Sequence, residues 1–468
     1  MNVNVNLKVK TYLLLLFLVP LLSCSSAEVK RETRTAFQLR PYQEETLPNG
    51  LRLLFIKDTS LPRLSFQMMV RAGALDEPRD LAGLNALVAE LMDQGTKTKS
   101  ATQIAEDFAL IGAEFQANPS EDYTFLTSSG IAIYGKELVS LFADVVTQPA
   151  FSPAEIHRVK AHQLAEIQKA QDEPDSFADE LLAKEVFPDH PYGYPGIGTK
   201  EGLQKIKREN ILAHYGKFYR PGQAILAVVG SFDEGLVHEI RERFSRWEAG
   251  PPVPPPAVAQ SESSKGTMKL ISKKGLQQTQ IRMGHLGIRR VDPDYLSLRA
   301  GNLILGGGFY SRLNQRVRDD LALTYGIFSS SDARADRGLF EINTASRNEK
   351  SADTIQETLA VLKDFVEKGV NDNEVTAAKT LMIGQFPSAI ETVDRLATNL
   401  LILRRYGVAD DYLSKYEANV NRLTTAEIND SIRRHIRPGQ INTLVYADRD
   451  QVLRALEKLG PWTVEEIH

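Results

Sequence analysis

The chain has 468 residues, of which 42% are hydrophobic and 25% are charged, and its formal net charge is −4 at pH 7. This length exceeds what one compact core usually supports, so it indicates two large domains or several smaller ones. Acidic and basic residues nearly balance and no long basic run occurs, so nucleic acid is not an expected partner.

The N-terminal segment resembles a secretion signal. Two lysines precede an apolar run over residues 12–22, which is too short to span a bilayer but has the length of a signal-peptide core. The run ends in Leu-Leu-Ser-Cys, similar to the bacterial lipobox, and Cys24 is the only cysteine of the chain. An ordinary signal peptide with an incidental cysteine is the alternative. We predict a signal peptide over 1–23 and a lipidated tether over 24–40, beginning at Cys24.

The predicted lipid determines the expected location. A mature chain that begins at a lipidated Cys24 contains no disulfide, because no other cysteine follows. Such a protein is anchored to a membrane through its lipid and is otherwise soluble. We therefore expect a lipoprotein that faces the bacterial periplasm, held at the outer membrane.

The first half of the chain alternates strand and helix signals. An Asn-Gly turn before a β-rich run indicates the first strand, and apolar residues at helical spacing indicate the helices. The expected elements are strands over 47–58 and 63–73, a helix over 82–92, a strand around 123–126, and helices over 136–146 and 153–171. This mixture predicts an α+β fold in which antiparallel sheets pack against helices on one face.

A Pro-rich and Ser-rich stretch over residues 250–266 interrupts the chain near its middle. Proline-rich segments stay extended and act as semi-rigid spacers, so this stretch predicts an interdomain linker. The sequences on its two sides are related. The tetrapeptide Arg-Pro-Gly-Gln begins at Arg220 and again at Arg437, each time before an apolar strand.

A second repeated feature has nearly the same spacing. A helix-opening segment over 151–155 has its counterpart over 370–374, an offset of 219 residues against 217 for the tetrapeptide. Two features in the same order at almost one offset predict a duplicated domain of about 200 residues. We expect an N-terminal domain over 41–249 and a C-terminal domain over 267–468.

Four segments together resemble one known family, the insulinase and mitochondrial processing peptidase family of zinc peptidases (inverzincins). The segments are LPNGLRLLF at 47–55, GLNALVAELMDQGT at 83–96, DHPYG at 189–193 and GGGFYSRLNQRVRDDLALTYG at 306–326. The similarity covers nearly all of the chain after residue 40. It implies two domains of duplicated α+β design, and two such units, from one chain or two, that close around an unfolded peptide.

The resemblance also identifies what the sequence lacks. Active members carry His-x-x-Glu-His on the first long helix, where two histidines bind zinc and the glutamate is the general base. Ala86 and Glu90 stand at the histidine positions and Ala89 stands at the base position. No histidine precedes His157, so no shift of register restores the motif. The chain is therefore similar to members that lack the metal site.

One improvised metal site stays open as an alternative. Glu166 falls where the family has its third ligand, and His162 lies four residues before it on the same helix face. Glu90 could approach from the first helix and complete a His-Glu-Glu set. The competing interpretation is a solvated or hydrogen-bonded surface. For His190, within DHPYG, we expect a structural role.

The second half retains an Arg and Tyr pair. The resemblance assigns Arg318 and Tyr325, seven residues apart, to the positions that cover a partner's zinc site and stabilise the developing oxyanion and the peptide backbone. We expect one to end a helix and the other to begin a strand, both facing a cleft. The alternative is that Arg318 pairs with Asp319 or another acid and that Tyr325 packs in the core.

Two segments resemble the substrate-contacting parts of the family. Ala117, Asn118 and Tyr123 fall in its edge strand, where extended substrate pairs through backbone hydrogen bonds. An ordinary guarded edge strand is the alternative. The turn of Gly306, Gly307 and Gly308 stands where the processing peptidase has a longer Gly-rich loop, and it lacks the Lys-Ser/Thr of a phosphate loop.

Three functions fit this pattern. In the first, the chain is the non-catalytic subunit of a heterodimeric zinc peptidase, inactive alone, with no cofactor of its own and with zinc in a His-x-x-Glu-His partner. In the second, it is a peptide-binding or scaffold lipoprotein without proteolytic role. In the third, it is a peptidase with the improvised metal site. The resemblance favours the first.

Overall fold

The computed structural model describes residues 39–254 and 266–467. The predicted signal peptide and Cys24 lie outside the described residues, as does most of the proline-rich linker. None of the helices described is both long enough and apolar enough to cross a membrane.

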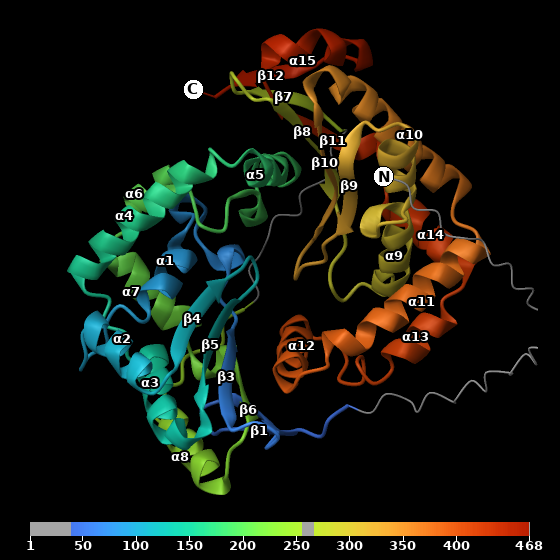
Figure 1. Cartoon of the computed structure of the whole chain (residues 1–468). Coiled ribbons are helices and arrows are strands. Elements are labelled where there is room, and N and C mark those ends of the chain that lie inside the picture. Colours follow the sequence, from blue (N-terminus) through green and yellow to red (C-terminus); the bar gives the residue numbers. More distant parts are fainter. Residues whose placement is uncertain (1–38, 255–265, 468) are drawn as a thin grey trace, which may run out of the picture. The chain divides into compact units, whose positions relative to one another are not determined.

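The first half contains a six-stranded sheet in the order β1-β2-β6-β3-β5-β4 (Figure 1). Its strands are β1 (Gln43–Thr46), β2 (Arg52–Lys57), β3 (Arg63–Val70), β4 (Glu114–Pro119), β5 (Thr124–Ile131) and β6 (Ala224–Gly230). β2 and β6 are parallel, whereas the other neighbours are antiparallel. The prediction of a purely antiparallel sheet is wrong, because a long crossover with several helices returns the chain beside β2 in the same direction.

Eight helices accompany this sheet in the described part of the first half. They are α1 (Leu84–Leu91), α2 (Ala101–Leu110), α3 (Gly135–Thr147), α4 (Pro153–Ala170), α5 (Pro174–Val186), α6 (Lys200–Lys205), α7 (Arg208–Phe218) and α8 (Glu234–Ser245). The helices expected over 82–92, 136–146 and 153–171 are α1, α3 and α4. α4 begins where the sequence indicates, because the Ser152 hydroxyl accepts the Glu155 N–H and proline occupies the first turn.

The second half repeats the sheet, in the order β12-β7-β11-β8-β10-β9. Its strands are β7 (Met268–Ser272), β8 (Gln278–Leu286), β9 (Thr324–Ser331), β10 (Leu339–Arg347), β11 (Asn442–Ala447) and β12 (Thr463–Glu466). β7 and β11 are parallel, as are β2 and β6, which hold the same places in the first sheet. The order β2-β6-β3-β5-β4 matches β7-β11-β8-β10-β9, which is the topology expected of a duplication.

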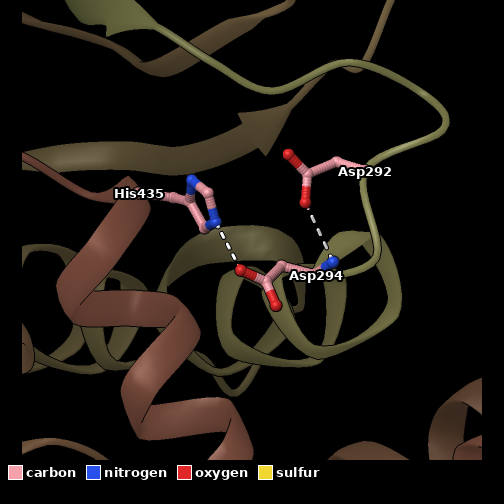
Figure 2. Close-up of side chains that lie close together, drawn as sticks. All are labelled: Asp292, Asp294 and His435. Atoms are coloured by element: carbon pink, nitrogen blue, oxygen red, sulfur yellow. Dashed lines mark hydrogen bonds and ion pairs between the residues drawn. The ribbon is translucent and has the colours of Figure 1, made fainter.

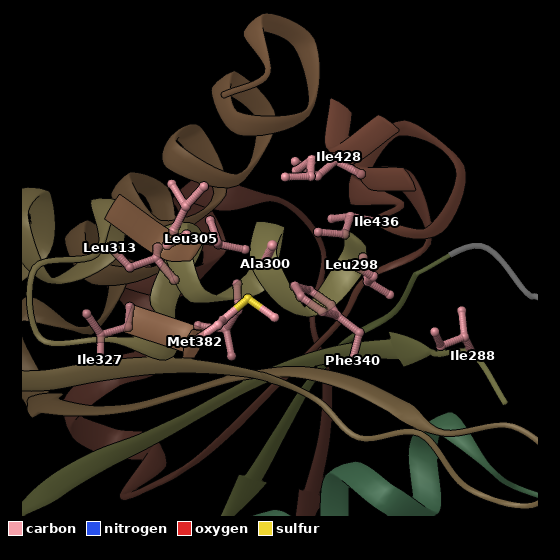
Figure 3. Close-up of a cluster of buried hydrophobic side chains, with 14 of the residues drawn as sticks. Ile288, Leu298, Ala300, Leu305, Leu313, Ile327, Phe340, Met382, Ile428 and Ile436 are labelled. Atoms are coloured by element: carbon pink, nitrogen blue, oxygen red, sulfur yellow. The ribbon is translucent and has the colours of Figure 1, made fainter. Parts of the chain in front are cut away.

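Helices of the second half cover a single large hydrophobic core (Figure 3). The helices are α9 (Tyr295–Asn302), α10 (Ser351–Lys368), α11 (Asp372–Ala389), α12 (Val393–Tyr406), α13 (Tyr416–Arg422), α14 (Thr425–His435) and α15 (Arg449–Leu456). Leu298 from α9, Met382 from α11 and Ile428 from α14 belong to the same buried cluster as Ile327 and Phe340 of the sheet. α11, the counterpart of α4, has the same length of 18 residues.

Each half also contributes one helix to the sheet of the other. α5 packs against β8 and β11 of the second sheet, and α12 packs against β3 and β6 of the first. Phe177 and Leu182 of α5 are buried in one cluster with Leu444 and Tyr446 of β11. Burying a side chain of this size contributes about 1.5–3 kcal/mol, so the exchange of helices stabilises both halves together. Residues Leu39–His468 accordingly form one unit by their contacts.

A buried carboxylate also joins the two halves. Asp122 is only 1% exposed, and its carboxylate accepts hydrogen bonds from the hydroxyls of Tyr192 and Tyr406 and from the backbone N–H of Ala335. Tyr192 belongs to the DHPYG segment, in which His190 Nδ1 accepts the Tyr192 N–H and His190 Nε2 lies 3.1 Å from an Asp336 oxygen. The DHPYG segment thus connects loops of both halves. His190 has a structural role in it, as expected from the sequence.

Candidate functional site

The start of α1 depends on a glycine and a distant glutamate. Gly83 has φ of 98°, and a Cβ there would lie 2.7 Å from the Ile197 carbonyl oxygen and 2.9 Å from Gly198 Cα. Only glycine fits both the left-handed backbone and this close approach. Because Gly83 offers no capping side chain, Glu77 caps the helix from outside, accepting the N–H groups of Gly83 at 2.8 Å and Asn85 at 2.7 Å.

This capping carboxyl makes the stability of the fold depend on pH. Burial raises the pKa of Glu77 from 4.5 to about 8. A raised pKa means that the stability contributed by Glu77 is fully present below about pH 4.5 and is lost as the pH rises through 8. We expect the free energy of unfolding to fall by about 4 kcal/mol between pH 5 and pH 9, and Glu77→Gln to remove that part of the dependence.

Urea unfolding at pH 5, 7 and 9 measures this effect. The difference between wild type and Glu77→Gln at each pH isolates the one carboxyl, because other titrating groups contribute equally to both proteins. Parallel stability curves for the two proteins across this range would contradict the assignment.

α1 carries the positions at which the resemblance expects metal ligands. Ala86 is 9% exposed and Ala89 is 1% exposed, and neither methyl group has a lone pair to offer. Glu90 Oε1 lies 3.3 Å from Nδ1 of His162 on α4, so two of the three residues of the improvised site do meet. Glu166 does not join them: within residues 39–254 and 266–467, no set of three that includes these residues has its ligand atoms within 4.8 Å of one another. The residues present therefore do not fit a zinc ion.

A different cluster of the described residues does bring three potential ligand atoms within 4.8 Å of one another. It consists of Asp292, Asp294 and His435 (Figure 2). Asp294 precedes α9, and its carboxylate lies 2.6 Å from His435 Nε2 and 3.0 Å from the guanidinium of Arg434. The Asp292 carboxylate accepts the Asp294 N–H. The arginine already supplies a positive charge, so this cluster is an ion-pair network that fastens α9 to the end of α14.

A cleft lies between α1, α4 and the edge strand β4. Ala86, Ala89 and Glu90 line it from α1, and Ala117 lines it from β4. Asn118 does not line it, because neighbouring residues of a strand face opposite sides. The expected edge-strand position of Tyr123 is wrong: Tyr123 lies in the turn that leads into β5, where a Ser120–Tyr123 hydrogen bond closes the hairpin.

Arg318 and Tyr325 line one cavity of about 820 Å³, whose walls come from the second half and from Asp175 and Asp179 of α5. Arg318 is in the helical turn Asn314–Asp320, and Tyr325 is the second residue of β9, the other edge strand. Tyr325 is 95% exposed, and its hydroxyl bonds to no residue of the described chain, so it does not pack in the core. Arg318 does pair with Asp319, with Nε–Oδ1 at 2.7 Å and Nη2–Oδ2 at 3.1 Å.

A strained turn fixes the spacing of this pair. Ala322 has φ of 50°, and the Leu323 N–H bonds back to the Val317 carbonyl, which is the pattern of a helix that ends in a left-handed residue. Glycine usually takes this place, and alanine there costs about 1 kcal/mol. The turn directs the chain from the helical turn that ends at Asp320 into β9, which begins at Thr324, within three residues.

Sequence reasoning missed several side chains around this pair. The Arg318 guanidinium carbon lies 3.9 Å from the centre of the Phe309 ring, a cation–π contact. Phe309 directly follows the three glycines of the turn expected at 306–308: Gly306 and Gly307 end a π-helical turn, and Gly306 is buried against Ser329. The cavity is also lined by Arg282, which pairs with Asp175 and Asp179 of α5. No motif in the sequence signals these contacts.

The duplicated α+β halves and the altered first helix define a peptidase-like two-domain unit, and comparisons identify its family. The sequence model of the family described as insulinase (peptidase family M16) matches residues 52–200. The sequence model of the domain described as peptidase M16 inactive domain matches residues 205–382. The chain belongs to the insulinase (M16) family of peptidases.

Relatives and solved structures agree with this membership. An uncharacterised zinc protease of Bacillus subtilis is 26% identical over 386 residues, 81% of this chain and 93% of that protein. An uncharacterised zinc protease of Mycobacterium tuberculosis is 29% identical over 402 residues, 84% and 90% of the two chains. A peptidase M16 inactive domain from Pseudomonas fluorescens has the same fold, with a TM-score of 0.81 at 24% identity over 87% of this chain and 98% of that one. A Helicobacter pylori protease is similar, with a TM-score of 0.77 at 18% identity over 88% and 100%.

Proposed function

We propose that this chain is the non-catalytic subunit of a heterodimeric insulinase-family zinc peptidase. In this role it is inactive alone and completes the active site of a partner that carries His-x-x-Glu-His and binds the zinc. Arg318 holds the backbone of an extended peptide, and the Tyr325 hydroxyl donates to the oxyanion that develops on the scissile carbonyl.

The observation that carries this proposal is the exposure of Tyr325. An aromatic ring that is 95% exposed contributes almost nothing to the core, and its hydroxyl has no partner in the described chain. Arg318 lines the same cavity, held by Asp319 and by the ring of Phe309. A held guanidinium beside a hydroxyl exposed to solvent suits a reaction that another polypeptide performs, since the chain's own first helix offers Ala86 and Ala89 where ligand and base are required.

The proposed location is the periplasmic side of a bacterial membrane, reached through lipidation at Cys24. The experiment is to isolate the lipoprotein from native membranes and assay hydrolysis of unfolded peptide with and without a chelator. Recovery of a zinc-bearing family member together with chelator-sensitive activity supports the proposal. Hydrolysis by the purified single chain, in proportion to its amount, contradicts it.

The cleft beside β4 favours a second candidate, a peptide-binding or scaffold lipoprotein with no proteolytic role. The described part of β4 pairs only with β5, which leaves its other edge available to an extended peptide. A complex that assembles but hydrolyses nothing with any partner would select this candidate.

A further inference from the structure

The cleft beside α1 has an acidic lining that the proposed function does not use. Glu90 lies at the end of α1, Asp93 follows the helix, and both line the same cleft of about 510 Å³. Asp93 forms no ion pair with any lysine, arginine or histidine of residues 39–254 and 266–467, and its carboxylate accepts the Gln94 amide and its own backbone N–H. The charge of Arg158 acts on both carboxylates, but its guanidinium forms its hydrogen bonds with Glu155 and Gln94. Burial raises the pKa of both Glu90 and Asp93, which shows that neither carboxylate is fully compensated.

A buried acceptor without a partner lines the same cleft. Gln163 of α4 is 1% exposed, and its amide nitrogen donates to the carbonyls of Gly83 at 3.3 Å and Ile197 at 2.5 Å. These two bonds fix the orientation of the amide and leave Oε1 without a hydrogen-bond donor among the described residues. A buried acceptor of this kind costs about 1–3 kcal/mol unless a ligand or water satisfies it.

The polar groups that this cleft offers to a ligand are therefore acceptors: the Asp93 carboxylate, the Glu90 carboxylate, whose Oε1 lies 3.3 Å from His162 Nδ1, and Gln163 Oε1. Its remaining walls are apolar, formed by side chains such as Ala86, Ala89 and Phe115. The chemistry that fits is a cationic donor on an apolar stem, because the head satisfies the acceptors while the stem lies against the walls. A zinc ion does not fit, since His162 is the only imidazole paired with Glu90 in the part of the chain that the structure describes, and the two alanines offer no ligand.

The alternation of side chains along β4 shows how a cationic side chain of a bound peptide can reach the cleft. Phe115, Ala117 and Pro119, spaced two residues apart, all line it from β4. A peptide strand paired with the free edge of β4 continues the sheet, so every second side chain of that peptide projects to the same face.

We propose that this cleft binds an organic cation of an extended peptide, the ammonium or guanidinium of a basic side chain or the amino terminus, with Glu90, Asp93 and Gln163 Oε1 as acceptors. The position at which active relatives hold a metal has thus become a recognition site for positive charge. The inference rests only on the peptide-binding part of the proposed function, not on the existence of a zinc-bearing partner.

Fluorescence anisotropy with the purified full chain tests it. The probe is a labelled, N-acetylated extended peptide with one lysine, compared with the same peptide carrying norleucine, which keeps the stem and removes the charge. We expect the lysine peptide to bind about tenfold more tightly, an advantage that weakens with added salt. Glu90→Gln and Asp93→Asn should each reduce the advantage and together abolish it, while Glu106→Gln, an exposed charge change on α2, should leave it intact.

Further measurements distinguish a basic side chain from a free amino terminus, and cation binding from uncharged peptide binding or zinc binding. A lysine-free peptide with a free amino terminus that matches the lysine peptide assigns the site to the terminus. Equal binding of the lysine and norleucine peptides overturns the inference while leaving peptide binding, and absence of any binding overturns both. Stoichiometric zinc in the purified chain that Glu90→Gln removes also overturns it. Because no partner is present, these outcomes are independent of the peptidase assay.

Discussion

Tyr325→Phe and Arg318→Ala are each expected to lower the peptidase activity of the mixed complex by about 100-fold. Removing one preorganised donor to a developing oxyanion typically costs this much or more, because the charge then grows in a site with nothing to replace the bond. Tyr325→Phe removes only a hydroxyl that has no partner in the described chain, so folding should be unchanged. The measurement is kcat and KM of the reconstituted pair, with assembly followed by size-exclusion chromatography.

Matched controls lie beside the pair. Tyr310 is 94% exposed and does not line the Arg318–Tyr325 cavity, so Tyr310→Phe removes an equivalent hydroxyl. Arg316 is in the same helical turn as Arg318 and pairs with Glu357, so Arg316→Ala removes an equivalent charge. Both controls should retain full activity. Assembled complexes of Tyr325→Phe and Arg318→Ala that hydrolyse peptide at the wild-type rate would remove the basis of the proposed role.

Local signals in the sequence were enough to place the elements that carry the site. Apolar residues at helical spacing predict a helix over 82–92, and the structure has α1 there, at Leu84–Leu91. The repeated Arg-Pro-Gly-Gln predicts two corresponding strands, and these are β6 in the first sheet and β11 in the second. Each tetrapeptide forms the short turn that leads into its strand. These features depend on neighbouring residues, which is why periodicity and turn chemistry find them.

Contacts between distant segments could not be predicted in this way. The apolar faces of α5 and α12 indicate that each helix is buried, but not that each covers the sheet of the other half. The same limit applies to the site: Asp93 and Gln163 belong to no motif, and their importance comes from a cleft that α1, α4 and β4 form together. The exposure of Tyr325 is likewise a property of the edge strand, since the sequence allows a buried tyrosine equally well.

Asp122→Ala is expected to destabilise the fold by about 3–5 kcal/mol, the largest stability effect among the changes considered. The Asp122 carboxylate accepts from Tyr192, Tyr406 and the Ala335 N–H, and alanine leaves all three donors without an acceptor in a buried site. Burial and the nearby Asp122 charge raise the pKa of both tyrosines, so both remain protonated donors throughout the working pH range. Urea unfolding followed by circular dichroism measures the loss.

Two further variants separate the network from a simple loss of charge. Asp122→Asn keeps one acceptor oxygen but presents an amide N–H₂ to the remaining donors, so its cost should lie between those of wild type and Asp122→Ala. Asp80→Ala removes an exposed carboxylate with no bond to the described residues and should stay within about 0.5 kcal/mol of wild type. Because Tyr406 and Ala335 belong to the second half and Tyr192 to the first, Asp122→Ala should also speed hydrogen exchange on both sides of the junction. Exchange that increases in only one half would show that the carboxylate stabilises that half alone and does not couple the two.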